Sequence, residues 1–414
     1  MGEKAAHHRG FRSRLALTPA QEARLDQQAH AARALWNLLH ELFTVSGARR
    51  PPLSYADGQI RWARANVDWL SDLPAQAAQA VLKTYRRAWV NCWEGRAEAP
   101  SYKSRSRAVL AVDVPQGRDL HVTRVHRRWG MVNIPKLGRV RFRWTRDLPG
   151  VTKGSPAGRI TGARLLKDAL GWHIAFRTES EVTATAPKDW ADSHVGIDRG
   201  IAVPLALSDG NTYEHGPWLN QAEDAQLLRA QQQAAHRKQY GKQGARVSKK
   251  LRAVYAQIKD LRARAKRRVL DWQHKTTSAI AQEYALVSVE RLDVVSMMKS
   301  AKGSPDSPGI RVAQKTGLNR SIAGEAWGRT VELLDYKLAH RGGVLMRVPA
   351  PGTSMRCSEC GLVTPGSRAS QARFACQNPA CGWSGNADFN ASRNIDRAGL
   401  VLASAAGRAV DRRT

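Results

Sequence analysis

The spacing of apolar residues changes early in the chain from alternation to a helical repeat. Residues 8–17 partly alternate polar and apolar side chains, as a half-buried strand does. From residue 19 to Leu42, apolar side chains recur three or four positions apart, after a Thr18-Pro19 pair typical of helix starts. The pattern therefore predicts a strand and then a helix, which Pro51 and Pro52 would end.

A second helical region is predicted over residues 57–93. Pro74 falls near the start of its last helix, where proline is tolerated. The region mixes large aromatic residues with lysine and arginine. We expect most of its tryptophans to pack in a core and one or two to remain for stacking; they are Trp62, Trp69, Trp89 and Trp93.

Residues 101–182 consist of short apolar runs separated by glycine, proline or aspartate. Short strands at this spacing predict an antiparallel barrel or sandwich. The strand at residues 8–17 is expected to join it, which makes the helices between them an insertion. Basic residues at alternate positions give one face of this sheet a positive charge; they are Arg139, Arg141 and Arg143, with Arg146 just beyond. This face could simply be solvated, but we favour a surface that contacts a phosphate backbone.

After a linker at residues 183–187, the second part of the chain begins with two strands and, past an S-D-G-N turn, a third. A long helical stretch is predicted over residues 219–283, interrupted near Gly241 and Gly244 and amphipathic in its second half. The nearly all-apolar run at residues 284–290 is typical of a central strand covered on both faces. Residues 300–319 are expected to form a mobile polar loop, before a helix over residues 323–341 and one more strand.

The charge of the chain points to its partner. Its 414 residues include 66 lysines and arginines against 35 aspartates and glutamates, a net charge of +31. This excess repels itself unless a polyanion neutralises it, so nucleic acid is favoured over a small-molecule substrate, although a GC-rich genome also inflates arginine. The positive charge is concentrated in the second half of the long helix, in Lys249, Lys250, Arg252, Lys259, Arg262, Arg264, Arg267 and Arg268. These side chains either form a solvated face or, as we favour, contact phosphates.

The apolar segments of the sequence do not suggest a membrane protein. The first residues lack the apolar core of a signal peptide, and no later run approaches the length that crosses a bilayer. We therefore expect a cytoplasmic prokaryotic protein that associates with the nucleoid when bound to DNA. In that compartment, four cysteines in two close pairs indicate metal ligands rather than disulfides.

The two cysteine pairs lie near the end of the chain. Cys357 and Cys360 are separated by two residues, and Cys376 and Cys381 by four. Four thiolates from two turns suit a tetrahedral, structural Zn²⁺ ion with no open position for catalysis. The wider second gap requires a bulge at residues 378–379.

Three acidic residues stand out by context. Asp198 and Glu290 each end an apolar strand, and Asp388 opens a helix-like segment just after the cysteines. Taken singly, Asp198 could be a structural acid in a turn, Glu290 could pair with Arg291, and Asp388 could be an acid that the helix dipole favours at the N-terminus. Together they fit a strand–strand–strand, helix, strand, helix order, the ribonuclease H-like plan, in which such acids converge at one sheet edge.

Three clustered carboxylates need cations to remain ionised. Two divalent ions about 3.5–4 Å apart would satisfy them, and Mg²⁺ is favoured because the ligands are hard oxygens. One ion would activate water and the other would stabilise the leaving 3′ oxygen of a phosphodiester. On this hypothesis Asp198, Glu290 and Asp388 are both the catalytic residues and the magnesium ligands.

Several motifs, specific as a set, resemble those of the TnpB (OrfB) family of insertion sequences and, through it, the smallest type V CRISPR effectors. The RuvC-like and zinc-ribbon motifs occur in order as V-G-I-D-R-G, V-S-V-E-R-L, T-S-M-R-C-S-E-C-G and A-D-F-N-A-S-R-N-I. Residues 12–21 and 271–277 also resemble the family. Two positions depart from it: the gap between Cys376 and Cys381, and Gly352, where an aromatic residue often stands.

The resemblance implies an α/β multidomain nuclease directed by a guide RNA to target DNA beside a short adjacent motif. The implied parts are a wedge-like β-barrel (residues 1–17 and 101–182), a helical recognition insertion (18–100), a ribonuclease H-like RuvC domain (188–355 and 383–396), an inserted zinc ribbon (356–382) and a C-terminal tail (397–414). A miniature type V effector with the same chemistry, a DNA transposase and a binding-only regulator remain alternatives. A transposase is disfavoured by the lack of a His–apolar–His pair, and a regulator by the intact acids. The oligomeric state stays open.

Overall fold

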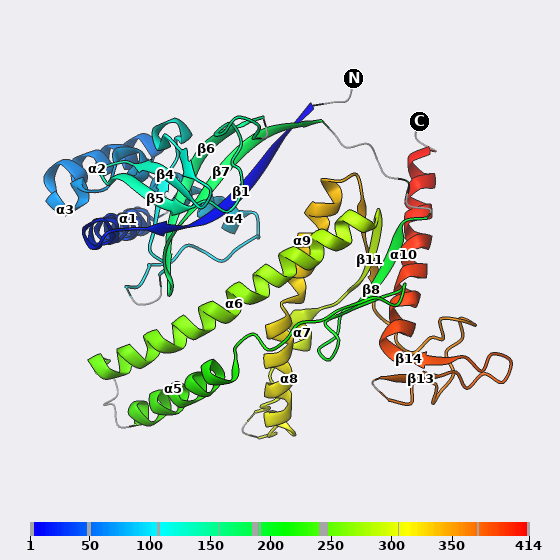
Figure 1. The fold of residues 1–414 in the computed structure, drawn as a ribbon. Helices are drawn as coiled ribbons and strands as arrows, with labels where there is room; N and C mark the ends of the chain where they lie inside the picture. The colour runs from blue at the N-terminus through cyan, green and yellow to red at the C-terminus, as the bar shows by residue number, and fades with distance from the viewer. Residues whose placement is uncertain are drawn as a thin grey trace. The chain divides into compact units, whose positions relative to one another are not determined.

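The computed structural model describes residues 4–47, 51–105, 108–155, 157–183, 189, 192–239, 247–304, 306–370 and 372–411. The chain divides into two compact units, Met1–Thr183 and Ala184–Thr414, and each has its own hydrophobic core (Figure 1). Among the described residues, no helix is both long and apolar enough to span a bilayer.

The first unit is built on a seven-stranded antiparallel sheet. Its strands are β1 (Lys4–Ala16), β2 (Ala111–Val114), β3 (Thr123–His126), β4 (Trp129–Ile134), β5 (Gly138–Arg143), β6 (Arg159–Asp168) and β7 (Gly171–Thr183), in the order β2-β6-β7-β1-β5-β4-β3. Strand β1 pairs with β7 along most of its length and with β5 at Leu15 and Ala16. The prediction that the first strand joins the later ones is therefore confirmed.

Four helices and a short 3-10 turn complete this unit. The helices α1 (Pro19–Val45), α2 (Leu53–Asn66), α3 (Asp68–Ser71) and α4 (Ala75–Trp93) lie between β1 and β2 in the chain, and η1 (Gly117–Leu120) follows β2. Helix α1 begins as predicted, because the Thr18 hydroxyl accepts from the Gln21 N–H while the Gln21 side chain accepts from the Thr18 N–H.

The expectation that most tryptophans of residues 57–93 lie in the core is wrong. Trp62, Trp69 and Trp93 are 63%, 51% and 52% exposed, and half-buried Trp89 stacks on Trp93 with ring centroids 5.9 Å apart. Aliphatic residues, alanines and Tyr85 take the inward positions instead, among them Ile60, Leu70 and Ala78.

The second unit contains a five-stranded mixed sheet in the order β10-β9-β8-β11-β12. The strands are β8 (His194–Asp198), β9 (Leu205–Leu207), β10 (Thr212–Tyr213), β11 (Leu286–Arg291) and β12 (Val344–Pro349). Strand β11 runs parallel to β8 on one side and to β12 on the other, while β9 and β10 are antiparallel additions. The predicted central strand, with both faces covered, is confirmed.

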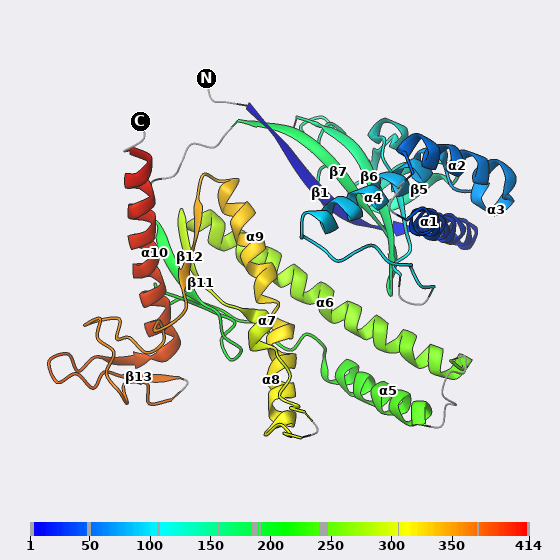
Figure 2. The same cartoon turned by 180° about the vertical axis from the view of Figure 1, so that it is seen from behind.

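Helices cover both faces of this sheet (Figure 2). The helices that the structure describes in this unit are α5 (Gln221–Gln239), α6 (Lys249–Glu283), α7 (Val294–Met297), α8 (Val312–Glu325), α9 (Trp327–Ala339) and α10 (Ala387–Asp411), of which α6, α9 and α10 contact the sheet. The end of α6 and helix α9 pack on one face, against Val195, Ile197 and Val287. Helix α10 covers the other face.

Two predictions about this unit need revision. Residues 300–319 are not a loop throughout, because α8 begins at Val312; polar side chains of α8 hold it, with Lys315 donating to the Met297 carbonyl at 2.6 Å and Asn319 to the Met298 carbonyl at 2.8 Å. Residues 397–411, expected to be a tail, continue α10.

Helices α5 and α6 pack against each other through a small apolar seam. The predicted stripe of α6 buries Leu251, Val254 and Ile258 against Ala230 and Ala234 of α5. Tyr255, placed in the same stripe, is 36% exposed. The predicted interruption at Gly241 and Gly244 lies outside the described residues.

Candidate carboxylate site and cysteine cluster

Two of the predicted acids stand side by side at the carboxyl ends of parallel strands. The pairing of β8 with β11 ends at Ile197 and Val289, and Asp198 and Glu290 follow directly. Because side chains alternate along a strand, both acids face away from the core that holds Ile197 and Val289. They therefore lie on the face that α10 covers.

Helix α10 runs antiparallel to β8, and every fourth residue of the helix lies beside every second residue of the strand. His194 Nδ1 lies 3.0 Å from Asp396 Oδ2, and a Cβ added to Gly196 would lie 2.2 Å from the Ser392 carbonyl oxygen. Two strand residues advance about 6.6 Å and four helix residues about 6.0 Å, so the next step of this register brings Asp388 to Asp198.

The start of α10 is held by a side-chain cap. The Asn386 Oδ1 atom accepts hydrogen bonds from the Asp388 N–H at 2.8 Å and the Phe389 N–H at 3.1 Å. An asparagine at this position satisfies N–H groups that have no partner inside the helix. The first turn of α10, with Asp388, is thereby fixed at the sheet edge.

The three acids influence one another electrostatically. Burial raises the pKa of Asp198 to about 7, and the negative charges of Glu290 and Asp388 add to the rise. Burial also raises the pKa of Asp388. The Arg368 guanidinium, from the segment that carries the cysteines, opposes both shifts. The structure thus brings the three predicted acids together, with one cation facing them.

Neighbouring side chains support Glu290 from two sides. The Thr353 hydroxyl donates to Glu290 Oε1, and the Arg199 guanidinium donates to the Glu290 carbonyl. Arg199 is buried between the charges of Asp198 and Glu290. These contacts hold the end of β11 beyond its last pairing with β8.

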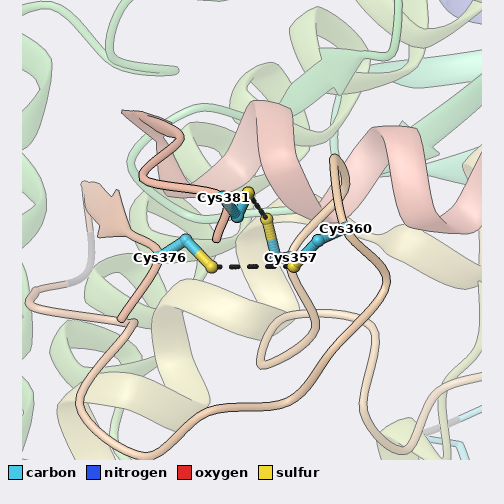
Figure 3. A group of neighbouring side chains, drawn as sticks. All are labelled: Cys357, Cys360, Cys376 and Cys381. Atoms are coloured by element: carbon cyan, nitrogen blue, oxygen red, sulfur yellow. Dashed lines mark hydrogen bonds between the residues drawn. The ribbon is translucent and has the colours of Figure 1, made fainter. Parts of the chain in front are cut away.

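The four predicted cysteines form a cluster with the spacing of a zinc site (Figure 3). The Sγ atoms of Cys357 and Cys381 are 3.8 Å apart, those of Cys360 and Cys376 are 3.7 Å apart, and all four lie within 4.8 Å of one another. A tetrahedral ion with Zn–S bonds of about 2.3 Å requires S–S distances of about 3.8 Å. The cluster therefore fits Zn²⁺.

The thiols of the cluster do not titrate alike. The backbone N–H of Leu362 lowers the pKa of Cys360 to about 6, whereas the neighbouring sulfurs help to raise the pKa of Cys376 to about 12 despite a backbone N–H that favours its thiolate. Four thiolates this close repel one another. A bound cation is what allows all four to be ionised together.

The turn between Cys376 and Cys381 absorbs the wide gap. The Asn378 carbonyl accepts from the N–H groups of Cys381 at 2.9 Å and Gly382 at 3.2 Å, so the extra residues form a closed bulge. Strands β13 (Arg373–Ala375) and β14 (Ser384–Asn386) pair beside it and lead directly into α10. The cysteine segment is thus joined to the start of that helix.

Asparagines of α10 attach the first cysteine turn. Asn390 Oδ1 accepts from the Ser358 N–H and Asn390 Nδ2 donates to the Arg356 carbonyl, both at 2.7 Å. Asn394 Nδ2 donates to the carbonyls of Arg356 at 2.7 Å and Thr353 at 2.9 Å. The cluster and the carboxylate site therefore share one helix.

The predicted nucleic-acid contacts of α6 have three kinds of surroundings. Lys249, Lys250, Arg252, Lys259 and Arg262 are exposed. Arg264 and Arg268 are instead engaged by Glu223 of α5; Arg268 contacts both carboxylate oxygens, at 2.5 and 3.0 Å, and this lowers the pKa of Glu223 to about 2. Arg267 is half-buried and has interactions of its own.

The cationic face predicted for the first unit is present on β5. Arg139, Arg141 and Arg143 are exposed while Val140 and Phe142 between them are buried. The guanidinium groups of Arg141 and Arg143 each lie 4.6 Å from the ring centre of Trp129 on the neighbouring strand. Arginines held over an aromatic ring keep a defined direction.

Some residues of the site had no sequence signal of their own. Arg368 lies in a G-S-R-A-S segment without periodicity, and Thr353 was noted only as part of the cysteine motif. Strand β6 was also missed, because a register shift between Ile160 and Gly162 interrupts its alternation.

Two protein-family models match the second part of the chain. The model of a probable transposase, OrfB_IS605, matches residues 175–301, and that of the Cas12f1-like TNB domain matches residues 327–395. Together these matches include Asp198, Glu290, Asp388 and the four cysteines.

Relatives extend over nearly the whole chain. InsQ of Escherichia coli (strain K12), described as a "putative RNA-guided DNA endonuclease", is 32% identical over 387 residues, which cover 92% of this chain and 90% of InsQ. A Streptomyces pristinaespiralis protein with the same description is 26% identical, over 96% of this chain and 91% of its own. The Cas12f1 endodeoxyribonuclease of Sulfoacidibacillus thermotolerans shares 47% identity over 60 residues, 14% of each chain.

A solved structure shares the fold. Cas12f1 in a complex with sgRNA and target DNA superposes with a TM-score of 0.55 at 14% identity, covering 92% of this chain and 83% of that one. The fold and the cysteine cluster define a mixed α/β protein of Cas12f-like architecture, with a four-cysteine cluster that fits a zinc-binding TNB domain. The chain belongs to the TnpB (OrfB) family of RNA-guided DNA endonucleases, which is related to Cas12f.

Proposed function

We propose that this protein is an RNA-guided endonuclease that cleaves target DNA beside a short adjacent motif, by phosphodiester hydrolysis at the edge formed by β8, β11 and α10. The observation that carries this proposal is the convergence of Asp198, Glu290 and Asp388 from those three elements. The sheet order and the helix across it agree with the ribonuclease H-like plan of RuvC nucleases.

The acid residues fit a pair of Mg²⁺ ions. Their ligands are hard oxygens, and the raised pKa of Asp198 reflects burial beside like charges, which a bound cation would relieve. Bound there, Mg²⁺ would activate the attacking water and stabilise the leaving 3′ oxygen. The three carboxylates hold the ions, and Thr353 and Arg199 hold Glu290 in place.

Arg368 has a separate role in this proposal. Its guanidinium faces Asp198 and Asp388 closely enough to oppose the rise in the pKa of both. A delocalised, always charged group beside the acids suits the extra negative charge of a phosphate under attack. The zinc ion is structural, because four cysteines leave no open position.

Nucleic-acid contacts are assigned by charge and exposure. The exposed cations of α6 and the β5 arginines would contact phosphates, and the exposed Trp62 and Trp69 would stack on bases. The helical insertion (18–100) and the wedge-like sheet (1–17 and 101–182) would hold the guide and read the adjacent motif. The names of the relatives, and the Cas12f1 complex with sgRNA and target DNA, support these partners.

The direct test is to purify the chain after expression with its native flanking DNA and to sequence the RNA that copurifies. We expect one discrete RNA, and reprogramming its variable end should redirect Mg²⁺-dependent cleavage of a plasmid library carrying randomised flanks. Cleavage that ignores the RNA would refute guidance.

The alternatives predict other products. Strand transfer would indicate the transposase, and RNA-dependent binding without cleavage would indicate the regulator. A repeat array beside the gene would assign the same chemistry to a miniature type V effector.

A further inference from the structure

We propose that Thr353 is a positioning residue that fixes the Glu290 carboxylate for the cation and makes that position depend on the folded cysteine segment. The inference rests on the proposed function of the acid site. It concerns Thr353, which lies in the chain between β12 and the first cysteine.

The Thr353 hydroxyl has two acceptors within reach. It donates to Glu290 Oε1, and the Ala350 carbonyl lies 2.8 Å from the same oxygen. A hydroxyl has one proton, and a carboxylate accepts it more strongly than a neutral carbonyl. The hydroxyl proton therefore points mainly to Oε1, and the Ala350 carbonyl is at most a second, weaker acceptor of the same proton.

The side chain of Thr353 is well placed to do this because it is only 8% exposed. The terminal torsion of a glutamate is otherwise broad and roughly two-fold, so an unrestrained carboxylate samples many directions. With Oε1 held, Oε2 remains the oxygen that can turn to a cation. Arg199 does not substitute for this contact, because its guanidinium bonds the Glu290 carbonyl.

The backbone of Thr353 links this contact to the cysteine cluster. Its carbonyl accepts from Asn394 Nδ2, which also donates to the Arg356 carbonyl. Asn390 donates to that same carbonyl and accepts from the N–H of Ser358, the neighbour of Cys357. A continuous set of hydrogen bonds thus runs from the first cysteine turn, through α10, to the carboxylate of Glu290.

The test compares Thr353→Val, which keeps the shape but loses the hydroxyl, with Thr353→Ser, which keeps the hydroxyl. Thr364→Val, a half-buried threonine of the same segment, is the matched control. Loss of a hydrogen bond that orients a metal ligand typically weakens metal binding about 10–100-fold. We expect Thr353→Val to raise the Mg²⁺ concentration for half-maximal cleavage by at least about tenfold, with the rate at saturating Mg²⁺ changed by less than about threefold.

A second readout does not depend on cleavage. Titration of the purified protein with Mn²⁺, followed by electron paramagnetic resonance, should show the same weakening in Thr353→Val, with near-wild-type binding in Thr353→Ser and Thr364→Val. Zinc content, measured by mass spectrometry, should be unchanged in all three.

The outcomes separate this inference from the proposed function. If the wild-type protein does not cleave with Mg²⁺, the proposed function fails. If the wild type cleaves and Thr353→Val matches it in Mg²⁺ and Mn²⁺ dependence, the positioning role is wrong. Loss of zinc or of the fold in Thr353→Val, or failure of serine to restore Mn²⁺ binding, would assign Thr353 a purely structural role and also overturn the inference.

Discussion

The cysteine cluster and the carboxylate site lie at the same helix but are assembled in different ways. The cysteines are at most 24 positions apart, and their sulfurs already lie within 4.8 Å of one another. The acids come from residues 198, 290 and 388, on two strands and a helix. Among the described residues, only the cysteines form a group of potential metal ligands whose ligand atoms all lie within 4.8 Å of one another. The carboxylate oxygens of the three acids are therefore more widely spaced.

On the proposed function, this difference separates two kinds of metal site. Local turns can bring four soft ligands together and leave no position open, which suits an ion that only stabilises. The acid site needs a complete sheet with a helix across it, and its wider spacing leaves room for water and a phosphate. The two sites are joined through α10, whose Asn390 and Asn394 bond the first cysteine turn.

The largest expected effect is on folding. Cys360→Ser should remove zinc and unfold the cysteine segment, because structural zinc contributes about 10–16 kcal/mol in small zinc domains, as much as the stability of a whole domain. Zinc content per chain and the urea midpoint would measure it. Cys92→Ser, at the fifth cysteine, is the control and should retain zinc; unchanged metal content in Cys360→Ser would contradict the four-cysteine site.

The next effect separates chemistry from folding. Asp198→Ala, Glu290→Ala and Asp388→Ala should each lower the cleavage rate by about a thousandfold or more, because each removes a cation ligand. Zinc content and nucleic-acid binding should not change. The exposed Asp192, just before β8, provides the control Asp192→Ala. A variant that cuts at a near-wild-type rate would remove that acid from the site.

A smaller effect concerns the pH dependence of stability without Mg²⁺. The pKa of Asp198 is about 7 in the folded protein, above its ordinary value of 3.8, so the folded state retains a proton that the unfolded state releases. Stability should therefore fall as pH rises from about 4 to about 7 and then level off. Asp198→Asn removes this penalty and should raise the free energy of unfolding by on the order of 3 kcal/mol at about pH 8, and by little near pH 4.

Urea unfolding in magnesium-free buffer that contains zinc would measure this gain, with Asp192→Asn as the control. Added Mg²⁺ should narrow the difference by stabilising the wild type alone. If Asp198→Asn is no more stable than the wild type at the higher pH, burial and the neighbouring acids do not raise the pKa of Asp198 as inferred.

The smallest effect tests the link between the two sites. A Cβ at Gly196 would lie 2.2 Å from the Ser392 carbonyl oxygen, so Gly196→Ala should push α10 from β8 at a cost of about 1–3 kcal/mol. Cleavage should fall while zinc stays bound. Gly328→Ala in α9, where a Cβ meets no atom within 4 Å, is the control. Equal activity of the two variants would mean that the contact of α10 with β8 does not position Asp388.

The sequence predicts the parts of both sites that follow from regular patterns. Paired cysteines predict the cluster, and acids at the ends of apolar strands predict Asp198 and Glu290, because those positions depend on local alternation. The contributions of Arg368 and Thr353 depend on how irregular segments return to the sheet, which no period records. The tryptophans of α2 to α4 were misplaced because residue size alone does not tell which face of a helix packs against small neighbours.

The matched steps of α10 and β8 also constrain how the chain can change in length. One residue inserted between Asp388 and Asp396 would rotate the acid by about 100° relative to the sheet, whereas added residues in the turn between the second pair of cysteines would leave it in phase. An effort to shorten this protein should therefore trim the turn between Cys376 and Cys381 and keep every residue from Asn386 to Gly399.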